Sequence, residues 1–273
     1  MTRPYVEVIG DPIAHSKSPL IHNFWLAKLG IDAEYRACHV RADELADYFA
    51  RRRGDAMWRG CNITIPHKEV ALAFVDHIGP DALQVGATNC VIASDGRLEA
   101  QNTDIAGVDE ALPGVHSSVC IIGCGGAARA AIPSLDVMCA IDVRVVARDQ
   151  SKAAAMLSDF DLEPQVFAFD QAESAMHGAE GVINASPLGM VGQCPMPQSI
   201  FAGLKSTTED AYVFDMVYNP LETELLKAGR GLNREAIDGL VMLVGQARTA
   251  FKQFFGVPAP REYDIELRSL LTA

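Results

Sequence analysis

The feature that most constrains the fold is a glycine-rich turn in mid-chain, Val119-Cys120-Ile121-Ile122-Gly123-Cys124-Gly125-Gly126-Ala127-Ala128. A short apolar run ends in glycines, and Arg129-Ala130-Ala131-Ile132 then reads as a helix start. Gly123, Gly125 and Ala128 fit the pattern G-x-G-x-x-A. Its positions serve a tight turn, close approach of the backbone to a pyrophosphate, and close packing of helix on strand. The N–H groups and positive dipole end of the new helix would face the phosphates.

A glycine-rich turn between a strand and a helix can also form without any ligand. Here the turn follows an apolar strand, opens into a helix, and is followed by a second predicted strand, Asp142–Ala147. This context favours dinucleotide binding. The residues before the turn, together with the end of the chain, are then expected to supply a substrate site.

Composition limits the class of protein. The chain has 273 residues, enough for one or two domains with a buried core. A hydrophobic content of 49% and a charged content of 21% are typical of a soluble globular protein. The formal net charge of -12 argues against nucleic-acid binding, which needs a basic surface. A small anionic ligand remains compatible, since surface charges are screened beyond roughly 8 Å at physiological salt.

Cysteine, histidine and apolar patterns indicate the compartment. The histidines show no metal-ligand spacing, the N-terminus has no apolar signal region, and no apolar run could span a bilayer. We therefore expect a cytoplasmic protein with reduced thiols, no metal site, and no membrane or nucleic-acid partner. The seven cysteines include no CxxC pair, and several sit in apolar runs: Cys38, Cys61, Cys90, Cys120, Cys124, Cys139 and Cys194.

The first polar loop follows a predicted strand, Tyr5–Gly10, and precedes a helix predicted over Pro19–Leu29. It holds Ser16 and Ser18 at the helix N-terminus. Such hydroxyls, together with the helix dipole, can form a pocket for a carboxylate. The spacing by itself favours the simpler interpretation that one serine caps the helix.

A strand at Tyr35–Val40 and a helix at Asp43–Arg53 come next, and the helix should bury Leu45, Tyr48 and Phe49. The helix ends in three consecutive arginines, Arg51-Arg52-Arg53. We interpret this run as a solvated helix end that complements the dipole.

A second polar segment surrounds a strand predicted over Cys61–Ile65, which Pro66 ends. Asn62 and Thr64 share one face of this strand, because side chains alternate with period two. Polar groups on a buried strand need partners, and a polyhydroxyl substrate could provide them. Lys68 follows the carboxyl end of the strand, where open α/β sheets bind ligands, but it could equally be a surface lysine at a helix start.

Asn89 lies in a strand predicted over Gly86–Ile92, and the hairpin turn Ser94–Arg97 leads into a returning strand. Asp104 follows the end of that strand. Its carboxylate can face a ligand, cap a helix predicted over Ile105–Ala111, or do both. The hairpin precedes the glycine turn and closes the first domain.

The cofactor preference depends on the residues after the strand Asp142–Ala147. An acidic residue there usually bonds the adenosine ribose 2′-hydroxyl of NAD, whereas an arginine favours the 2′-phosphate of NADP. This chain has both Arg148 and Asp149, and Lys152 adds positive charge. We expect NADP, with NAD possible because of Asp149, although Asp149 could merely cap the helix predicted over Ser151–Ser158.

Two further strands, Gly181–Ala185 and Tyr212–Val217, and a long helix, Leu240–Phe255, complete the chain. Apolar residues recur at helical spacing along the long helix, so one of its faces belongs to a core. Gln246 lies off that stripe. It could reach a ligand, but the pattern alone favours a solvent-facing residue.

Eight segments of this chain, taken together, resemble one family, the shikimate dehydrogenases. They occur in the family's order and cover nearly the whole chain, and the S-K-S-P, N-x-T-x-P-x-K and N-T-D blocks are highly specific in combination. The segments are Ala14–Pro19, Asn62–Lys68, Gly86–Asn89, Asn102–Asp104, the glycine turn, Asn184–Met190, Asp215–Tyr218 and Gly239–Ala247.

The resemblance implies an α/β fold, with an N-terminal α/β substrate domain and a Rossmann-like doubly wound dinucleotide-binding domain. The substrate-binding catalytic domain would comprise residues 1–105, joined by C-terminal helices at 239–273, and the NADP-binding domain residues 106–238. The implied reaction is the reversible, NADPH-dependent reduction of 3-dehydroshikimate to shikimate, in chorismate and aromatic amino acid biosynthesis.

The resemblance also implies residue roles. Lys68 and Asp104 would form the catalytic pair, and both would contact the substrate. Ser16 and Ser18 would hold the shikimate carboxylate, with Tyr218 nearby. Ring hydroxyls would be bound by Asn62, Thr64, Asn89, Asp104 and Gln246. Cofactor contacts would come from Gly123, Gly125, Gly126, Ala127, Arg148, Lys152, Ser186, Gly239 and Met242. The family often has Asn-Arg-Thr where this chain has Ala147-Arg148-Asp149.

Two alternatives stay open. One is a quinate or quinate/shikimate dehydrogenase that uses NAD, whose substrate differs by a hydroxyl at the ring carbon that bears the carboxylate. The other is a non-catalytic, shikimate-sensing homologue, and the presence of Lys68, Asp104 and the glycine turn argues against it. We expect a monomer or a homodimer that binds a small-molecule substrate.

Overall fold

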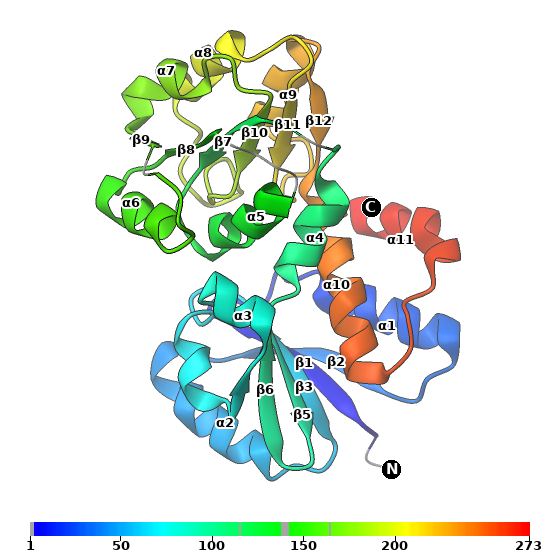
Figure 1. Ribbon diagram of the computed structural model, residues 1–273. Coiled ribbons are helices and arrows are strands. Elements are labelled where there is room, and N and C mark those ends of the chain that lie inside the picture. Colours follow the sequence, from blue (N-terminus) through cyan, green and yellow to red (C-terminus); the bar gives the residue numbers. More distant parts are fainter. Residues whose placement is uncertain (1–2, 115, 138–141, 164) are drawn as a thin grey trace. The chain divides into compact units, whose positions relative to one another are not determined.

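The computed structural model describes residues 3–114, 116–137, 142–163 and 165–273, so Cys139 and the first two residues lie outside the described part. The chain divides into two compact units (Figure 1). Unit 1 comprises residues 1–106 and 244–273, and unit 2 comprises residues 107–243. The start of helix α10 (Gly239–Phe255), up to Leu243, belongs to unit 2 because Met242 packs into its core, whereas the sequence predicts residues 239 onward with the first domain.

Unit 1 is built on a mixed sheet in the order β2-β1-β3-β5-β6-β4. β1 pairs in parallel with both β2 and β3, β5 is antiparallel to β3, and β5 and β6 form a hairpin. Asp95 and Gly96 at the hairpin turn both have positive φ, as two-residue hairpin turns prefer. The strands are β1 (Tyr5–Gly10), β2 (Glu34–His39), β3 (Trp58–Ile63), β4 (His77–Ile78), β5 (Cys90–Ser94) and β6 (Arg97–Gln101).

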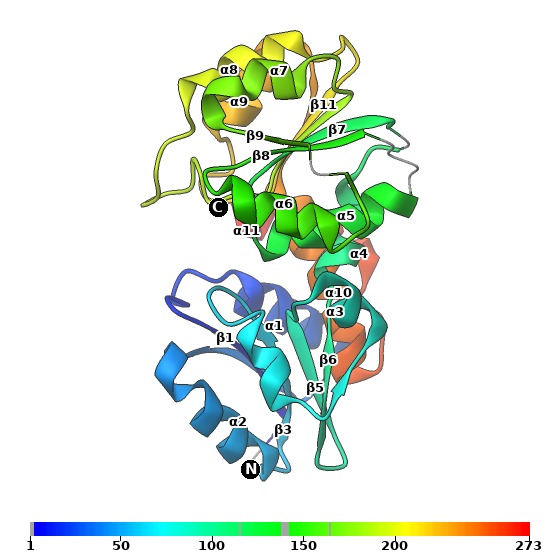
Figure 2. The same cartoon turned by 60° about the vertical axis from the view of Figure 1, so that its left-hand side comes forward.

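Alternation along β1 supplies two cores, one on each face of the sheet. Tyr5 and Ile9 pack with α2 (Leu45–Arg53), which buries Leu45, Tyr48 and Phe49 as predicted. Val6 and Val8 pack instead with α10. Figure 2 shows α2 and α10 on opposite sides of this sheet. The remaining helices of unit 1 include α1 (Ser18–Leu29), α3 (Pro80–Val85) and α11 (Asp264–Thr272), and a 3₁₀ turn, Ala42–Glu44, replaces the start of the helix predicted over Asp43–Arg53.

The expectation that the arginine run is solvated is wrong for Arg52. Its guanidinium contacts both carboxylate oxygens of Glu7, at 2.7 and 2.9 Å. Glu7 points into the core from β1 and is 1% exposed, and the Tyr48 hydroxyl donates to it at 2.8 Å. A buried carboxylate requires such partners, so the ion pair outweighs solvation of the helix end.

Unit 2 is a doubly wound α/β unit whose six strands are all parallel, in the order β12-β11-β10-β7-β8-β9. Helices α5 (Gly126–Val137) and α6 (Gln150–Ser158) cover one face. Helices α7 (Ala172–Met176), α8 (Gln198–Gly203) and α9 (Glu224–Gly231) cover the other (Figures 1 and 2). The strands are β7 (Ser118–Ile122), β8 (Asp142–Val146), β9 (Gln165–Phe167), β10 (Gly181–Asn184), β11 (Tyr212–Asp215) and β12 (Glu235–Ile237).

The strand order reverses direction between β7 and β10, and ligands of such sheets bind outside the carboxyl ends of the strands at this switch point. The glycine turn follows β7 and therefore lies there. No helix within the described part of the chain is long and apolar enough to cross a membrane.

Candidate active site and cofactor loop

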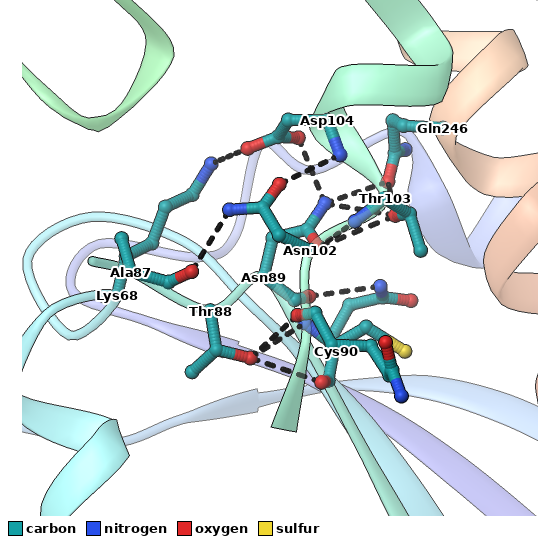
Figure 3. A network of polar contacts seen from close by, with 11 residues as sticks. Lys68, Ala87, Thr88, Asn89, Cys90, Asn102, Thr103, Asp104 and Gln246 are labelled. Atoms are coloured by element: carbon teal, nitrogen blue, oxygen red, sulfur yellow. Dashed lines mark hydrogen bonds and ion pairs between the residues drawn. The ribbon is translucent and has the colours of Figure 1, made fainter. Parts of the chain in front are cut away.

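The centre of the candidate active site is an ion pair between Lys68 and Asp104 in unit 1 (Figure 3). Lys68 lies in the turn after β3, and Asp104 is the first residue of α4 (Asp104–Ala111). Lys68 Nζ lies 2.5 Å from Asp104 Oδ2, and the two side chains are only 20% and 7% exposed. The buried His67 ring bonds the Val40 carbonyl at 2.6 Å and anchors this turn. The surface-lysine interpretation is therefore wrong.

The second carboxylate oxygen of Asp104 is also engaged. Asn89 Nδ2 donates to Asp104 Oδ1 at 2.8 Å. The backbone N–H of Asp104, one of the free donors at the start of α4, is bonded by Asn102 Oδ1 at 3.0 Å. The carboxylate is thus held within the site, and α4 begins at Asp104 itself, one residue earlier than the sequence predicts.

Gln246, on α10, reaches the same network (Figure 3). Its Oε1 accepts from Asn89 Nδ2 and from the Thr103 hydroxyl, both at 3.4 Å. The solvent-facing interpretation of Gln246 is therefore wrong. Thr103, the middle residue of the N-T-D block, was not predicted as a site residue, because nothing in the local sequence shows that its hydroxyl faces the network.

Tyr35 extends the network from β2. Its hydroxyl donates to Asn62 Oδ1 at 2.7 Å, and Asn62 Nδ2 donates to the Asn89 carbonyl at 3.0 Å. Burial raises the pKa of Tyr35 well above its usual value, and a hydrogen bond with the Ser18 side chain partly offsets that effect. Hydrogen bonds therefore connect Tyr35 through Asn62 to Asn89, whose side chain bonds Asp104. Sequence reasoning missed Tyr35, because strand alternation assigns a tyrosine at that position to the core.

The two serines lie at the start of α1. The residue that precedes the helix is Lys17, which makes no side-chain capping bond, so the serine-cap interpretation is wrong at that position. Ser16 Oγ accepts instead from the Ser18 N–H at 3.3 Å. Thr64 lies just past the end of β3, and its methyl group packs against Gly10, where a Cβ would come within 2.5 Å of it.

The glycine turn of unit 2 has the geometry that its pattern predicts. Gly123 has φ +105°, and a Cβ there would lie 2.9 Å from the Ser186 Cβ, so the turn packs directly on the loop after β10. A Cβ on Gly125 would meet nothing within 4 Å, which leaves this side of the turn open. Ala128 is fully buried between helix and sheet. This geometry suits a dinucleotide, whose pyrophosphate would approach the N-terminus of α5.

The loop after β8 carries three charged residues, Arg148, Asp149 and Lys152, of which Asp149 has a structural role. Asp149 caps α6, and its Oδ1 accepts the Lys152 N–H at 2.9 Å. Cys124, in the glycine turn, lies 3.8 Å from the Asp149 carbonyl. Burial raises the pKa of the Cys124 thiol, and the positive charges of Lys152 and Arg148 partly offset this. Both cations are exposed.

A buried network supports the loop after β10. Asn184 Oδ1 accepts from the Ser186 hydroxyl at 2.7 Å, and Asn184 Nδ2 donates to Asp215 Oδ1 at 2.8 Å. Asp215 is fully buried, which raises its pKa. Gly239 leaves no room for a Cβ beside the Met216 carbonyl, at 2.5 Å, and Met242 is 8% exposed. Burial also raises the pKa of Tyr218, which lies in unit 2 after β11.

The part of the chain that the structure describes has no group of three or more histidine, cysteine, aspartate or glutamate side chains that could hold a metal ion.

Two family models match the chain. Residues 8–91 match the shikimate dehydrogenase substrate binding domain, and residues 239–266 match the shikimate 5'-dehydrogenase C-terminal domain. The first match covers most of the unit 1 site, including Lys68 and Asn89, and the second contains Gln246.

Known proteins are similar over the full length of the chain. The NADP(+) shikimate dehydrogenase of Sphingopyxis alaskensis is 44% identical over 99% of this chain and 97% of its own. The crystal structure of Thermus thermophilus shikimate 5-dehydrogenase in complex with NADP(H) and shikimate is 30% identical, with a TM-score of 0.85 over 98% of this chain and 99% of that one. Quinate dehydrogenase of Corynebacterium glutamicum in complex with NAD is 29% identical, with a TM-score of 0.87 over 98% and 99%. The chain belongs to the shikimate dehydrogenase family.

Proposed function

We propose that the chain is an NADP-dependent shikimate dehydrogenase, an oxidoreductase that reversibly reduces 3-dehydroshikimate to shikimate in chorismate and aromatic amino acid biosynthesis. The observation that carries this proposal is the ion pair between Lys68 and Asp104, at 2.5 Å within a largely buried polar network. The curated NADP(+) shikimate dehydrogenase of Sphingopyxis alaskensis, at 44% identity, supports the choice of substrate and cofactor.

The pair suits the acid–base half of the reaction. NADPH supplies the hydride when it is bound. As a carbonyl becomes an alcohol, negative charge develops on its oxygen, and the Lys68 ammonium can stabilise that charge and deliver the proton. Asp104 orients the ammonium and can accept a hydrogen bond from a neighbouring hydroxyl of the ring. Because Asn89 also bonds Asp104, at 2.8 Å, the carboxylate is oriented before any substrate binds.

Shikimate has a carboxylate at one end of its ring and hydroxyls at the other, and the unit 1 network offers groups for both. We assign Ser16 and Ser18 to the carboxylate. The place of the two serines at the start of α1 supports this assignment, since hydroxyls beside the positive end of a helix dipole suit an anion. Tyr218, in unit 2, is proposed as a further substrate-binding residue on the family resemblance alone. The groups assigned to the hydroxyls are Asn62, Thr64, Asn89, Asp104 and Gln246, and Lys68 contacts the substrate as part of the catalytic pair.

The cofactor assignment rests on unit 2. The open side of the glycine turn at Gly125 fits a pyrophosphate. Asp149 is used as a helix cap, which supports the assignment of the 2′-phosphate to Arg148 and Lys152. The full set of cofactor residues in this proposal is Gly123, Gly125, Gly126, Ala127, Arg148, Lys152, Ser186, Gly239 and Met242.

One spectrophotometric assay tests the proposal. The purified protein is supplied with shikimate or quinate, each with NADP+ or NAD+, and reduction of the cofactor is followed. We expect kcat/KM to be highest with shikimate and NADP+. A higher value with quinate and NAD+ would favour a quinate dehydrogenase. No turnover with any pair, while shikimate still binds in calorimetry, would favour a sensing protein.

We also propose a cytoplasmic monomer or homodimer without a nucleic-acid partner. The six cysteines in the described part of the chain are all free thiols, as expected in a reducing compartment. The net charge of -12 opposes binding to nucleic acid. Sedimentation analysis of the purified protein would establish the oligomeric state.

A further inference from the structure

We propose that Asn102 is a positioning residue that sets the geometry of the Lys68–Asp104 pair, an inference that rests on the proposed dehydrogenase function. Asn102 lies between β6 and α4 and is 3% exposed. Its side chain contacts neither reacting group of the pair in Figure 3. It bonds the backbone of Asp104 and that of Ala87.

The Asn102 amide bridges two segments of backbone. Its Oδ1 accepts the N–H of Asp104 at 3.0 Å, and its Nδ2 donates to the carbonyl of Ala87 at 2.9 Å. The bonds fix the orientation of the amide, since only the oxygen can accept from an N–H and only the nitrogen can donate to a carbonyl. The start of α4 is thereby held to the loop at 86–89, which precedes β5.

That loop also holds the lysine. The N–H of Thr88 donates to the carbonyl of Lys68 at 2.8 Å, and the fully buried Thr88 hydroxyl donates to the Gln101 carbonyl at 2.7 Å. The loop therefore touches the backbone of Lys68 on one side and, through Asn102, the backbone of Asp104 on the other (Figure 3).

These bonds form a closed ring. From Lys68 it runs through Thr88 and Ala87 to Asn102, then to Asp104, and back across the ion pair. Lysine has a long, flexible side chain that does not fix its own ammonium in space. The separation of the two charges consequently depends on the two backbone positions. Asn102 ties one to the other at the Asp104 N–H, and Asn89 Oδ1 adds a bond to the N–H of Thr103 at 2.7 Å.

Two substitutions separate positioning from simple helix capping. Asn102→Ala removes both bonds. Asn102→Ser keeps an oxygen that can accept the Asp104 N–H but cannot reach the Ala87 carbonyl. Asp55→Ala is the matched control in the same unit, because Asp55 Oδ1 also accepts the N–H of the residue two positions on, Met57, at 2.9 Å.

We expect Asn102→Ala to lower kcat by about 10- to 100-fold, since a misplacement of about 1 Å can cost that much in rate. Asn102→Ser should lower kcat nearly as far, and the KM for NADP+ should stay unchanged in both. Asp55→Ala should keep kcat within about twofold, as expected for a substitution away from the reacting groups. A normal kcat in Asn102→Ala, or a full recovery of kcat in Asn102→Ser, would overturn the proposal.

A double-mutant cycle distinguishes positioning from a general loss of structure. If Asn102 acts through Lys68, adding Asn102→Ala to Lys68→Ala should lower kcat by no more than about threefold further, because groups that act as a unit are not additive. Full multiplication of the two effects would overturn the inference. If Asn102→Ala does not fold, Asn102→Ser takes its place in the cycle. An inactive wild-type protein would overturn the proposed function itself, whereas an active one with multiplicative effects would overturn only the role of Asn102.

Discussion

Lys68 and Asp104 lie 36 positions apart in the chain, yet their side chains form a 2.5 Å ion pair. The lysine is carried by the turn after β3, and the aspartate begins the helix that follows β6. Both belong to unit 1, so the geometry of the pair is a property of that unit alone. Asn89 and Asn102 hold the aspartate from either side, which makes the carboxylate a fixed partner for the ammonium.

The open side of the glycine turn leads to a prediction for Gly125→Ala. The added Cβ meets nothing within 4 Å, so the free energy of unfolding should change by less than about 0.5 kcal/mol. The methyl group would stand where the pyrophosphate approaches the backbone, so the KM for NADP+ should rise about tenfold or more. Gly231→Ala, whose Cβ also meets nothing within 4 Å, is the control. An unchanged KM for NADP+ in Gly125→Ala would argue against this cofactor loop.

Because Asp149 is engaged as the cap of α6, Arg148 is expected to decide the preference for NADP+ over NAD+. Arg148→Ala should raise the KM for NADP+ by about 10- to 100-fold, the equivalent of one hydrogen bond to a charged group. The KM for NAD+ should barely change, and the loss should shrink at high salt because Arg148 is exposed. Lys205→Ala, which removes another exposed cation of unit 2, should affect neither constant. An equal rise in KM for NADP+ and for NAD+ would show that Arg148 does not bind the 2′-phosphate.

Much of the fold could be predicted because its strands carry clear patterns. Tyr5–Gly10 was predicted with its observed ends, and the glycine turn marks the start of α5 from local chemistry alone. Short elements such as β4, β9 and β12 were not predicted, since two or three residues carry no periodicity and their pairing with longer strands decides their conformation.

Arg52 illustrates a contact that local sequence hides, and it leads to a stability prediction. Arg52→Ala leaves Glu7, which is 1% exposed, with a weakened set of partners, so the free energy of unfolding should fall by about 3 kcal/mol. Arg51→Ala, at the exposed neighbouring position, should change it by less than about 0.5 kcal/mol. Urea unfolding of the two variants tests this. If Arg52→Ala lowered the free energy of unfolding no more than Arg51→Ala does, the Arg52–Glu7 ion pair would not stabilise the fold.

The buried ring of His22 predicts a pH dependence. Burial lowers the pKa of His22 from 6.5 to about 3, and its ring stacks on Tyr35 at 4.0 Å. The unfolded chain then binds a proton that the folded chain does not, so this residue destabilises the fold as pH falls from about 6.5 toward 3. Between pH 7.5 and 5 the loss from this group should be about 2 kcal/mol.

The comparison with His22→Phe isolates that contribution. This variant should lose about 2 kcal/mol less than the wild type between pH 7.5 and 5, as measured by urea unfolding. His77→Gln, at an exposed position, should follow the wild type. Parallel pH profiles for the wild type and His22→Phe would contradict the assignment of a neutral, buried His22.

The site could be predicted only in part from the sequence, for a physical reason. Lys68 and Asp104 stand at strand ends, where ligand sites are expected, and motif resemblance assigned them roles. Tyr35 and Gln246 enter the network from other elements. The strand pattern around Tyr35 fits an ordinary core residue, and the helix pattern around Gln246 fits an ordinary surface residue. Such roles depend on tertiary packing, which brings together residues that are distant in sequence.

The most direct test of the account is the kcat of Lys68→Ala with shikimate and NADP+, measured beside the affinity for shikimate. Lys227→Ala, an exposed lysine of unit 2, serves as the control. If Lys68 acts as the acid–base group, its loss should lower kcat by about 10²- to 10⁴-fold, while the dissociation constant of shikimate changes far less. A kcat close to that of the wild type would contradict the catalytic role of the Lys68–Asp104 pair.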